Sequence, residues 1–279
     1  MTPFLKMHGA GNDFVVFDAR QNPISLSSEQ VKRLCDRRTG IGCDQLIVME
    51  SSPHADVFMR IYNADGGEVA TCGNASRCVG WLVMNEGNKK SVSLDTKGGK
   101  LSASWMDAHR VTVDMGKPRL DWKEIPLSHP VDTLHLQIGI GAAQDPVGVS
   151  MGNPHAVFFV DNVTDQMVRG SGSVLEHHAL FPERANISFA TVKDRGHIQL
   201  RVWERGAGET LACGSGACAT LVAAVRRGLA ERSAKVSLLG GDLWIEWLQG
   251  ADEAGGSVLM SGPVAVSFHG ECELNAYDH

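Results

Sequence analysis

The sequence predicts an α+β protein made of two pseudo-symmetric lobes, each a β-barrel-like sheet wrapped around a central helix. Three observations support this prediction: an internal repeat across most of the chain, short β-branched and aromatic segments in each half, and one apolar helical segment in each half. A repeat with such a long period indicates two similar domains rather than a solenoid. We therefore expect a shared site in the cleft between the two lobes.

Two cysteine-containing segments define the repeat. "RIYNADGGEVATCGNASRCVGWL" and "RVWERGAGETLACGSGACATL" carry Cys72 and Cys213, which lie 141 positions apart (213 minus 72). The same shift aligns other residues of the two halves: Arg60 with Arg201, Asn63 with Glu204, Gly73 with Gly214, Asn12 with Asn153, and Gln45 with Asn186. The repeat predicts a first lobe at residues 1–117 and a second at 118–262.

The strands and the hairpin are predicted from local composition. Four segments are β-branched or aromatic and short, which is typical of strands: residues 13–19, 56–63, 155–161 and 197–204. Residues 91–107 alternate on both sides of Gly98-Gly99, which predicts a hairpin with a Gly-Gly turn.

Three helices follow from capping residues and apolar patterning. Residues 27–38 have Ser27 or Ser28 as N-cap and read as a surface helix. Residues 73–87 and 214–229 read as helices ended by Gly87 and Gly228. The last of these helices has almost no polar face in its first turns, so we expect it to be buried inside its sheet.

Charge and composition exclude several classes of function. The net charge is −6 with a pI near 6.0, and no Lys/Arg run is present, which argues against a nucleic-acid or membrane-surface partner. No apolar run is long enough to span a bilayer. The N-terminal segment does not read as a signal peptide, so we expect a cytoplasmic protein. The seven cysteines include no C-x-x-C pair, so we expect neither a disulfide framework nor a metal site.

Cys72 and Cys213 each stand where a helix is predicted to begin. The free N–H groups and the dipole at a helix N-terminus favour negative charge, so these thiols should ionise more easily than a free cysteine. The same N–H groups can hold a carboxylate, and the glycine after each cysteine allows close approach of a ligand. Each lobe would therefore offer a thiol together with an anion-binding site.

Two such lobes suit two-base racemisation of a small α-amino acid. A thiolate on one face of the α-carbon removes its proton, and a thiol on the other face delivers one, which inverts the centre. Nothing in the sequence requires pyridoxal phosphate, so we expect no cofactor. A free cysteine is usually a small buried hydrophobe, and this reading is preferred for Cys35, Cys43, Cys78, Cys218 and Cys272.

The chain resembles the diaminopimelate epimerase family. The resemblance lies in "MHGAGNDFVV", "GCDQLI", "YNADGGEVATCGNASRC", "MGNPHAV", "ANIS" and "WERGAGETLACGSGACA", which occur in the family's order along almost the whole chain. It implies two lobes with the active site in their cleft, and a C-terminal strand in 263–279 that completes the first lobe. It also implies interconversion of LL- and meso-2,6-diaminopimelate, in lysine and peptidoglycan precursor synthesis, by a two-base cysteine mechanism.

The resemblance also implies roles for individual residues. Cys72 and Cys213 would be the catalytic acid and base, with His155 and Glu204 beside them. Substrate-binding positions would be Asn12, Gln45, Asn63, Gly73, Asn74, Asn153, Asn186, Glu204, Arg205, Gly214 and Ser215. Phe268 stands where the family often has a dimer-contact tyrosine, which implies a homodimer. Arg60 and Arg201 carry no family role and read as structural ion-pairing residues.

Two other readings remain open at this point. One is another isomerase of the same architecture, for proline, hydroxyproline or a phenazine precursor. Proline-type substrates would not need Glu204, Arg205 and the asparagines, and a phenazine-type enzyme would not need two thiols. The other is a redox-switched carboxylate-binding protein in which Cys72 and Cys213 form a reversible disulfide.

Overall fold

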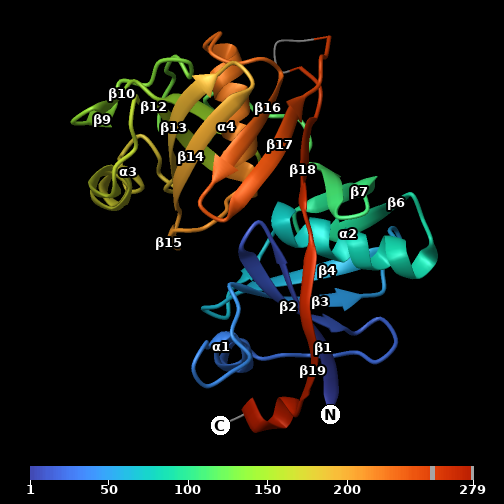
Figure 1. Cartoon of the computed structure of the whole chain (residues 1–279). Helices are drawn as coiled ribbons and strands as arrows, with labels where there is room; N and C mark the ends of the chain where they lie inside the picture. The colour runs from blue at the N-terminus through green and yellow to red at the C-terminus, as the bar shows by residue number, and fades with distance from the viewer. Residues whose placement is uncertain (252–254, 278–279) are drawn as a thin grey trace. The chain divides into compact units, whose positions relative to one another are not determined.

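The structure is a computed structural model that describes residues 1–251 and 255–277, and the chain divides into two compact units (Figure 1). Unit 1 comprises Met1–Val113 and Ser261–His279, and unit 2 comprises Asp114–Met260. The chain therefore passes out of unit 1 and later returns to it. Of the C-terminal segment 263–279, residues 278–279 lie outside the described part.

Unit 1 is mostly sheet. Its strands are β1 (Thr2–Gly9), β2 (Asn12–Asp18), β3 (Gln45–Glu50), β4 (Val57–Asn63), β5 (Glu68–Val69), β6 (Ser91–Thr96), β7 (Gly99–Asp107), β8 (Arg110–Asp114) and β19 (Ala265–Cys272). Its helices are α1 (Ser28–Cys35), α2 (Gly73–Gly87) and the short 3₁₀ segment η2 (Leu274–Tyr277).

Unit 2 repeats the pattern with additions near its start. Its strands are β9 (Gly139–Ile140), β10 (Ala143–Gln144), β11 (Val147–Ser150), β12 (Pro154–Phe159), β13 (Asn186–Asp194), β14 (His197–Glu204), β15 (Gly208–Glu209), β16 (Ser233–Leu238), β17 (Gly241–Trp247) and β18 (Val258–Pro263), whose end lies in unit 1. Its helical elements are the π-helical turn η1 (Gln166–Ser171), α3 (Gly172–Leu175) and α4 (Gly214–Arg226).

The duplication read from the sequence extends to strand pairing. In unit 1, β2 pairs parallel with β3, β3 antiparallel with β4, and β4 parallel with β6. In unit 2, β12, β13, β14 and β16 pair in the same senses. Even the register agrees, because Phe14 lies opposite Gln45 and His155 lies opposite Asn186. Residues related by the shift of 141 therefore occupy equivalent places in the two sheets.

Helices α2 and α4 are the buried helices of their units. Helix α4 contacts the strands of its sheet, and its residues from Gly216 to Ala224 are all buried. Helix α2 contacts β1, β4, β6 and β7 and is buried from Gly73 to Gly80. Alanine and glycine allow this close packing because small side chains let the strands approach the helix axis. Each helix start is thereby held by the surrounding sheet of its own unit.

Other sequence predictions are confirmed with small changes. Ser27 caps α1 in a capping box with Gln30, and β19 pairs with β1 (Figure 1). The predicted bounds of α2 are confirmed, although Asn88, and not Gly87, takes the left-handed C-cap conformation. The hairpin turn is shifted by one residue, since Thr96 pairs with Gly99 and the turn is Lys97-Gly98. Strand β1 was not predicted.

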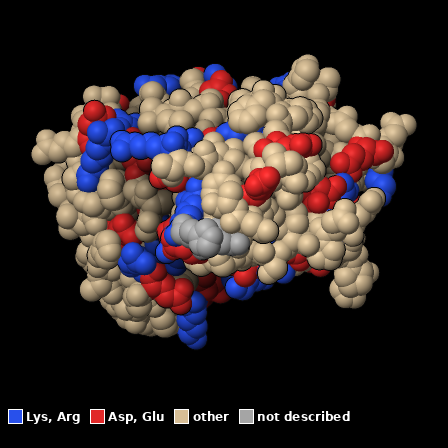
Figure 2. All heavy atoms as spheres, turned by 90° about the horizontal axis from the view of Figure 1, so that it is seen from below, with Lys and Arg blue, Asp and Glu red and all other residues tan. Residues whose placement is uncertain are grey.

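Arg60 and Arg201 are structural ion-pairing residues, as the sequence suggested. Arg60 binds Glu50 and Glu68, and Arg201 binds Glu209 and Asp165. Figure 2 shows Lys/Arg and Asp/Glu side chains next to one another at several places on the face that it draws. Within residues 1–251 and 255–277, no helix has the length and apolar character needed to cross a membrane.

Candidate functional site

Cys72 is the N-cap residue of α2. Its extended backbone ends the loop after β5, and its sulfur accepts a hydrogen bond from the Ala75 N–H over 3.5 Å. The side chain is half-buried, whereas Gly73 and Asn74 behind it are buried. The predicted placement of this thiol at a helix start is confirmed, and a helix N-terminus stabilises negative charge on its cap.

Asn12 lies beside the Cys72 sulfur and is hydrogen-bonded to Asn74. The Asn12 Oδ1 atom lies 4.0 Å from Cys72 Sγ, which can donate its S–H, and accepts a hydrogen bond of 3.2 Å from Asn74 Nδ2. On the other side of its amide, Asn12 donates to Asp44 Oδ2 over 3.0 Å. The structure thus brings three of the predicted site residues of unit 1 into contact.

Gln45 and Asn63 form a second polar pair in unit 1. They stand opposite each other on β3 and β4, and Gln45 Nε2 donates to Asn63 Oδ1 over 2.9 Å. The buried Oε1 atom of Gln45 has no hydrogen-bond partner among the described protein atoms. A buried amide oxygen without a partner is costly, so this atom is a plausible acceptor for a ligand donor.

Cys213 is the N-cap residue of α4 and is buried. Its sulfur lies 3.7 Å from Ser215 Oγ and also interacts with the Gly216 N–H and the Glu204 side chain. A Cβ atom at position 216 would lie 3.1 Å from this sulfur, so glycine keeps the helix start open beside the thiol. Glu204 comes from the end of β14 and accepts a short hydrogen bond from Thr210 Oγ1.

The expectation of an easily ionised thiol is wrong for Cys213. Burial and the neighbouring Glu204 carboxylate raise the pKa of the Cys213 thiol well above its ordinary value, and they outweigh the Gly216 N–H and Ser215 hydroxyl. Burial acts in this direction because it disfavours the charged form. The sequence showed the helix start but gave no measure of burial, and here burial is the larger effect. Cys213 therefore holds its proton and is suited to donate it.

A charge-removing substitution tests the influence of Glu204. Glu204→Gln is expected to lower the pKa of Cys213, because the thiolate no longer faces a carboxylate. The measurement is a titration of thiolate ultraviolet absorbance, taken as the difference between each protein and the same protein with Cys213→Ser. Glu231→Gln, which removes an exposed carboxylate of the same unit, should leave the titration unchanged. An unmoved titration in Glu204→Gln would contradict this assignment.

His155 and Asn153 lie side by side at the start of β12. His155 is fully buried, and burial together with the charge of Arg205 lowers its pKa to about 3, so the imidazole is neutral. Its Nε2 lies 3.0 Å from Asn153 Oδ1, and the Asn153 amide donates over 3.3 Å to Ser215 Oγ. The predicted His155 therefore connects to the Cys213 helix start through Asn153 and Ser215.

Asn186 and Arg205 are linked through the backbone. The buried Asn186 side chain accepts from the Arg205 N–H over 3.0 Å and donates to the Pro154 carbonyl over 3.0 Å. The exposed Arg205 guanidinium donates to the Glu183 carbonyl over 3.0 Å. Asn186 thus fixes the turn that carries Arg205.

Three residues close to these sites were not singled out in the sequence. Thr210 donates to Glu204, Asp44 accepts from Asn12, and the fully buried Arg77 donates to Asn74. One signal was available, because an arginine inside the otherwise apolar segment 73–87 is unusual for a buried helix. Thr210 and Asp44 had no such signal, since polar residues in loops are common.

The sequence comparisons agree over nearly the whole chain. A family model described as diaminopimelate epimerase matches residues 4–120 and 147–266. The chain is 53% identical to a diaminopimelate epimerase of Acidiphilium cryptum (strain JF-5), over 97% of this chain and 96% of that protein. It is 50% identical to one of Phenylobacterium zucineum (strain HLK1), over 96% and 97%.

Solved structures share the fold at low sequence identity. A probable proline racemase from Agrobacterium radiobacter K84 superposes with a TM-score of 0.71 at 16% identity, over 100% of this chain and 94% of that one. A hydroxyproline epimerase from Agrobacterium vitis gives 0.68 at 15%, over 96% and 91%. These similarities confirm the predicted two-lobed, mostly sheet fold class. At such low identity they show the fold alone.

Proposed function

The chain belongs to the diaminopimelate epimerase family, and from that premise we propose that it interconverts LL- and meso-2,6-diaminopimelate with Cys72 and Cys213 as acid and base. The observation that carries the cysteine assignment is the repeated helix start. Two cysteines related by the shift of 141 each cap a buried helix, and each is followed by a buried glycine. No other described cysteine occupies an N-cap position.

Each helix start supports the proposed chemistry with two groups. The cap thiol exchanges a proton with the α-carbon, and N–H groups of the first helical turn bind the α-carboxylate. Charge that develops on this carboxylate during proton removal is stabilised by the same N–H groups. No electron-withdrawing cofactor takes part in this scheme.

The proton balance of one turnover is simple. One cysteine, as thiolate, takes the α-proton and becomes a thiol, while the other, as thiol, gives its proton to the opposite face and becomes a thiolate. The raised pKa of Cys213 favours the state in which Cys213 carries the proton. In that state Cys213 is the acid and Cys72 the base. The reverse reaction starts from the other protonation state.

The polar residues of both units suit a substrate with two amino-acid ends. Gln45 and Asn63 in unit 1 and Asn153, Asn186, Glu204 and Arg205 in unit 2 offer amide, carboxylate and guanidinium groups. A guanidinium binds a carboxylate in a two-pronged manner, and a carboxylate accepts from an ammonium group. We assign these groups to the end of the substrate that does not react.

Proton exchange with solvent tests the proposed reaction. The reduced protein is incubated with LL-diaminopimelate in heavy water without pyridoxal phosphate, and α-deuterium and stereochemistry are followed together. We expect deuterium at the α-carbon of the meso product, because the proton that the acid delivers comes from a thiol in exchange with solvent. Folded protein with free thiols that produced no meso isomer and no exchange would contradict the proposal. Heat-treated protein provides the blank.

We extend the proposal to assembly and location. Phe268 on β19 is 48% exposed and packs edge-on against Phe4 of β1, with ring centroids 6.2 Å apart. An exposed aromatic ring on a sheet surface suits an interface between copies of the chain. We assign the protein as a homodimer acting in the cytoplasm, with a small molecule as its partner and no nucleic acid or membrane.

A further inference from the structure

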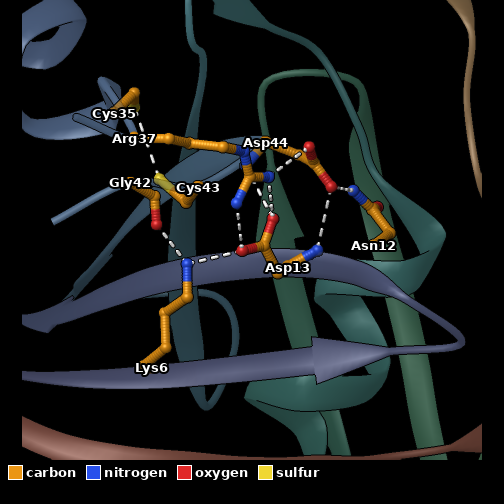
Figure 3. A network of polar contacts seen from close by, with 8 residues as sticks. All are labelled: Lys6, Asn12, Asp13, Cys35, Arg37, Gly42, Cys43 and Asp44. Atoms are coloured by element: carbon orange, nitrogen blue, oxygen red, sulfur yellow. Dashed lines mark hydrogen bonds and ion pairs between the residues drawn. The ribbon is translucent and has the colours of Figure 1, made fainter.

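We infer that Asp44 is a positioning residue that fixes which side of the Asn12 amide faces Cys72. This inference deepens the proposed function, because it concerns the proposed catalytic thiol of unit 1. Figure 3 shows the residues on which it depends: Asp44 lies between Asn12 on one side and Asp13 and Arg37 on the other.

The Asp44 carboxylate is held from three directions. Its Oδ2 atom accepts from Asn12 Nδ2 over 3.0 Å and from the Asp13 N–H over 3.1 Å, and its Oδ1 atom accepts from Arg37 over 2.8 Å. Asp13 and Asp44 bind each other reciprocally: the Asp13 Oδ1 atom accepts from the Asp44 N–H over 3.0 Å. Lys6 and Arg37 in turn bind the Asp13 carboxylate. This reciprocal network fixes the position of Asp44.

A carboxylate accepts hydrogen bonds and an amide has one accepting and one donating side. Asp44 therefore takes the Nδ2 side of Asn12, which leaves Oδ1 toward Cys72 Sγ, 4.0 Å away. Asn74, which donates to Asn12, is fixed in orientation as well. Arg77 only donates, so it takes Asn74 Oδ1 over 2.8 Å and turns Asn74 Nδ2 toward Asn12 Oδ1.

The consequence is chemical. A carbonyl oxygen beside a sulfur accepts from a thiol and repels a thiolate, whereas an amide N–H would favour the thiolate. Asp44 thus helps to set the protonation state and orientation of Cys72 without touching it. Without this acceptor, only the bond from Asn74 Nδ2 still holds Asn12 Oδ1 in place, so the Asn12 amide turns more easily and can donate to the sulfur.

This arrangement is absent from the matching positions of unit 2. The shift of 141 places Ala185 opposite Asp44 and Cys218 opposite Arg77. The matching amide, Asn153, is oriented the other way, with its Nδ2 toward Ser215 and its Oδ1 toward His155. The two helix starts are therefore related by the repeat but differ in the polarity of the amide beside the cysteine. In unit 1, Asp44 sets this polarity from the Nδ2 side of Asn12, and Arg77 supports it through Asn74.

A double-mutant cycle on the full-length protein tests the inference. Asp44→Ala, Asn12→Ala and the double variant are compared for two readouts: kcat/KM of epimerisation, and the pH dependence of Cys72 alkylation by iodoacetamide, followed peptide by peptide. We expect Asp44→Ala to lower kcat/KM by about tenfold, the size of one lost hydrogen bond. The same variant should shift Cys72 alkylation to lower pH. Both effects should be largely lost when Asn12 is already alanine.

The cycle separates positioning from a direct effect of charge. Removing the Asp44 charge also favours a thiolate at Cys72, but that effect persists in the Asn12→Ala background. Equal shifts in both backgrounds would overturn the inference. Asp44→Asn removes the charge but keeps an acceptor toward Asn12, so it should retain more activity than Asp44→Ala. If the alanine variant does not fold, Asp44→Asn tests the inference by itself: Cys72 alkylation should stay near the wild-type profile, and a shift of the same size with and without Asn12 would overturn the inference. Glu29→Gln, on the exposed face of α1, is the charge control.

The two readouts also distinguish this inference from the proposed function. Alkylation of Cys72 requires no substrate and no turnover. If the wild-type protein did not epimerise diaminopimelate, the proposed function would fail, and the alkylation cycle would still report whether Asp44 acts on Cys72 through Asn12. If epimerisation is present but the alkylation profiles are additive, only the positioning role of Asp44 is excluded.

Discussion

Cys72→Ser and Cys213→Ser are each expected to lower kcat for epimerisation by about 10²- to 10⁴-fold, the usual contribution of a positioned acid or base. A serine hydroxyl is close to a cysteine thiol in size, but it ionises far less readily, so it cannot take the α-proton. Both substitutions should leave the fold intact, since a serine is an ordinary N-cap residue. The measurement is the conversion of LL- to meso-diaminopimelate, with unfolding followed in parallel.

The same helices supply matched controls. Cys78 and Cys218 are fully buried further along α2 and α4, and burial raises the pKa of the Cys78 thiol to about 12. Cys78→Ala and Cys218→Ala should keep most of the turnover of the wild-type protein, apart from a modest loss of stability. If Cys72→Ser or Cys213→Ser retained turnover comparable to these controls, the two-base mechanism would be wrong.

The two variants should also differ from each other in their pH dependence. Burial and Glu204 keep Cys213 in its thiol form, so the loss of Cys213 removes mainly a proton donor, whereas Cys72 is half-buried at the helix start of unit 1. Only part of this difference could be predicted from sequence. The repeat aligns Asn63 with Glu204, so a carboxylate near only one cysteine could be expected, whereas the burial of each cap could not.

Much of the fold could be predicted because one shift relates the two halves. Gln45 and Asn186 align in sequence, and each lies at the start of a strand with the same partners in the same register. The helix starts at Cys72 and Cys213 were predicted from glycine and apolar patterning alone. Strand β1 was missed because "TPFLKMHG" contains a proline, a lysine and a histidine, and its pairing with the distant β19 is not encoded locally.

The parts of the site that escaped prediction depend on contacts between distant segments. Asp44 reaches Asn12 because β2 and β3 run parallel, which places the loop before β3 beside the start of β2. Nothing in the sequence around Asp44 indicated that this loop residue would contact Asn12. Arg77 did carry a signal, since a charged side chain in a buried helix needs a partner. Its partner, Asn74, lies one turn earlier on the same helix and had been predicted only as a substrate contact.

Arg77→Met is expected to lower the free energy of unfolding by about 2–3 kcal/mol, because it leaves the buried Asn74 Oδ1 without a charged donor. Arg77 is fully buried, and its Nη1 donates to Asn74 Oδ1 over 2.8 Å. A Cβ atom on residue 9 would lie 2.9 Å from Arg77 Nη2, so the glycine at this position of β1 leaves room for the guanidinium. Methionine fills a similar length but supplies no donor.

Denaturant unfolding of Arg77→Met measures this loss of stability. The matched control is Arg33→Met on the half-exposed face of α1, which should change the free energy of unfolding little. Arg77→Lys keeps a charged donor on a shorter side chain and should fall between the wild type and Arg77→Met. Unchanged stability in Arg77→Met would contradict this prediction. Arg77→Met should also lower activity. Once Arg77 no longer binds the side-chain carbonyl of Asn74, the Asn74 amide can turn and its Nδ2 need not donate to Asn12. Turnover per folded molecule should then fall in Arg77→Met, whereas a purely structural arginine would alter stability alone.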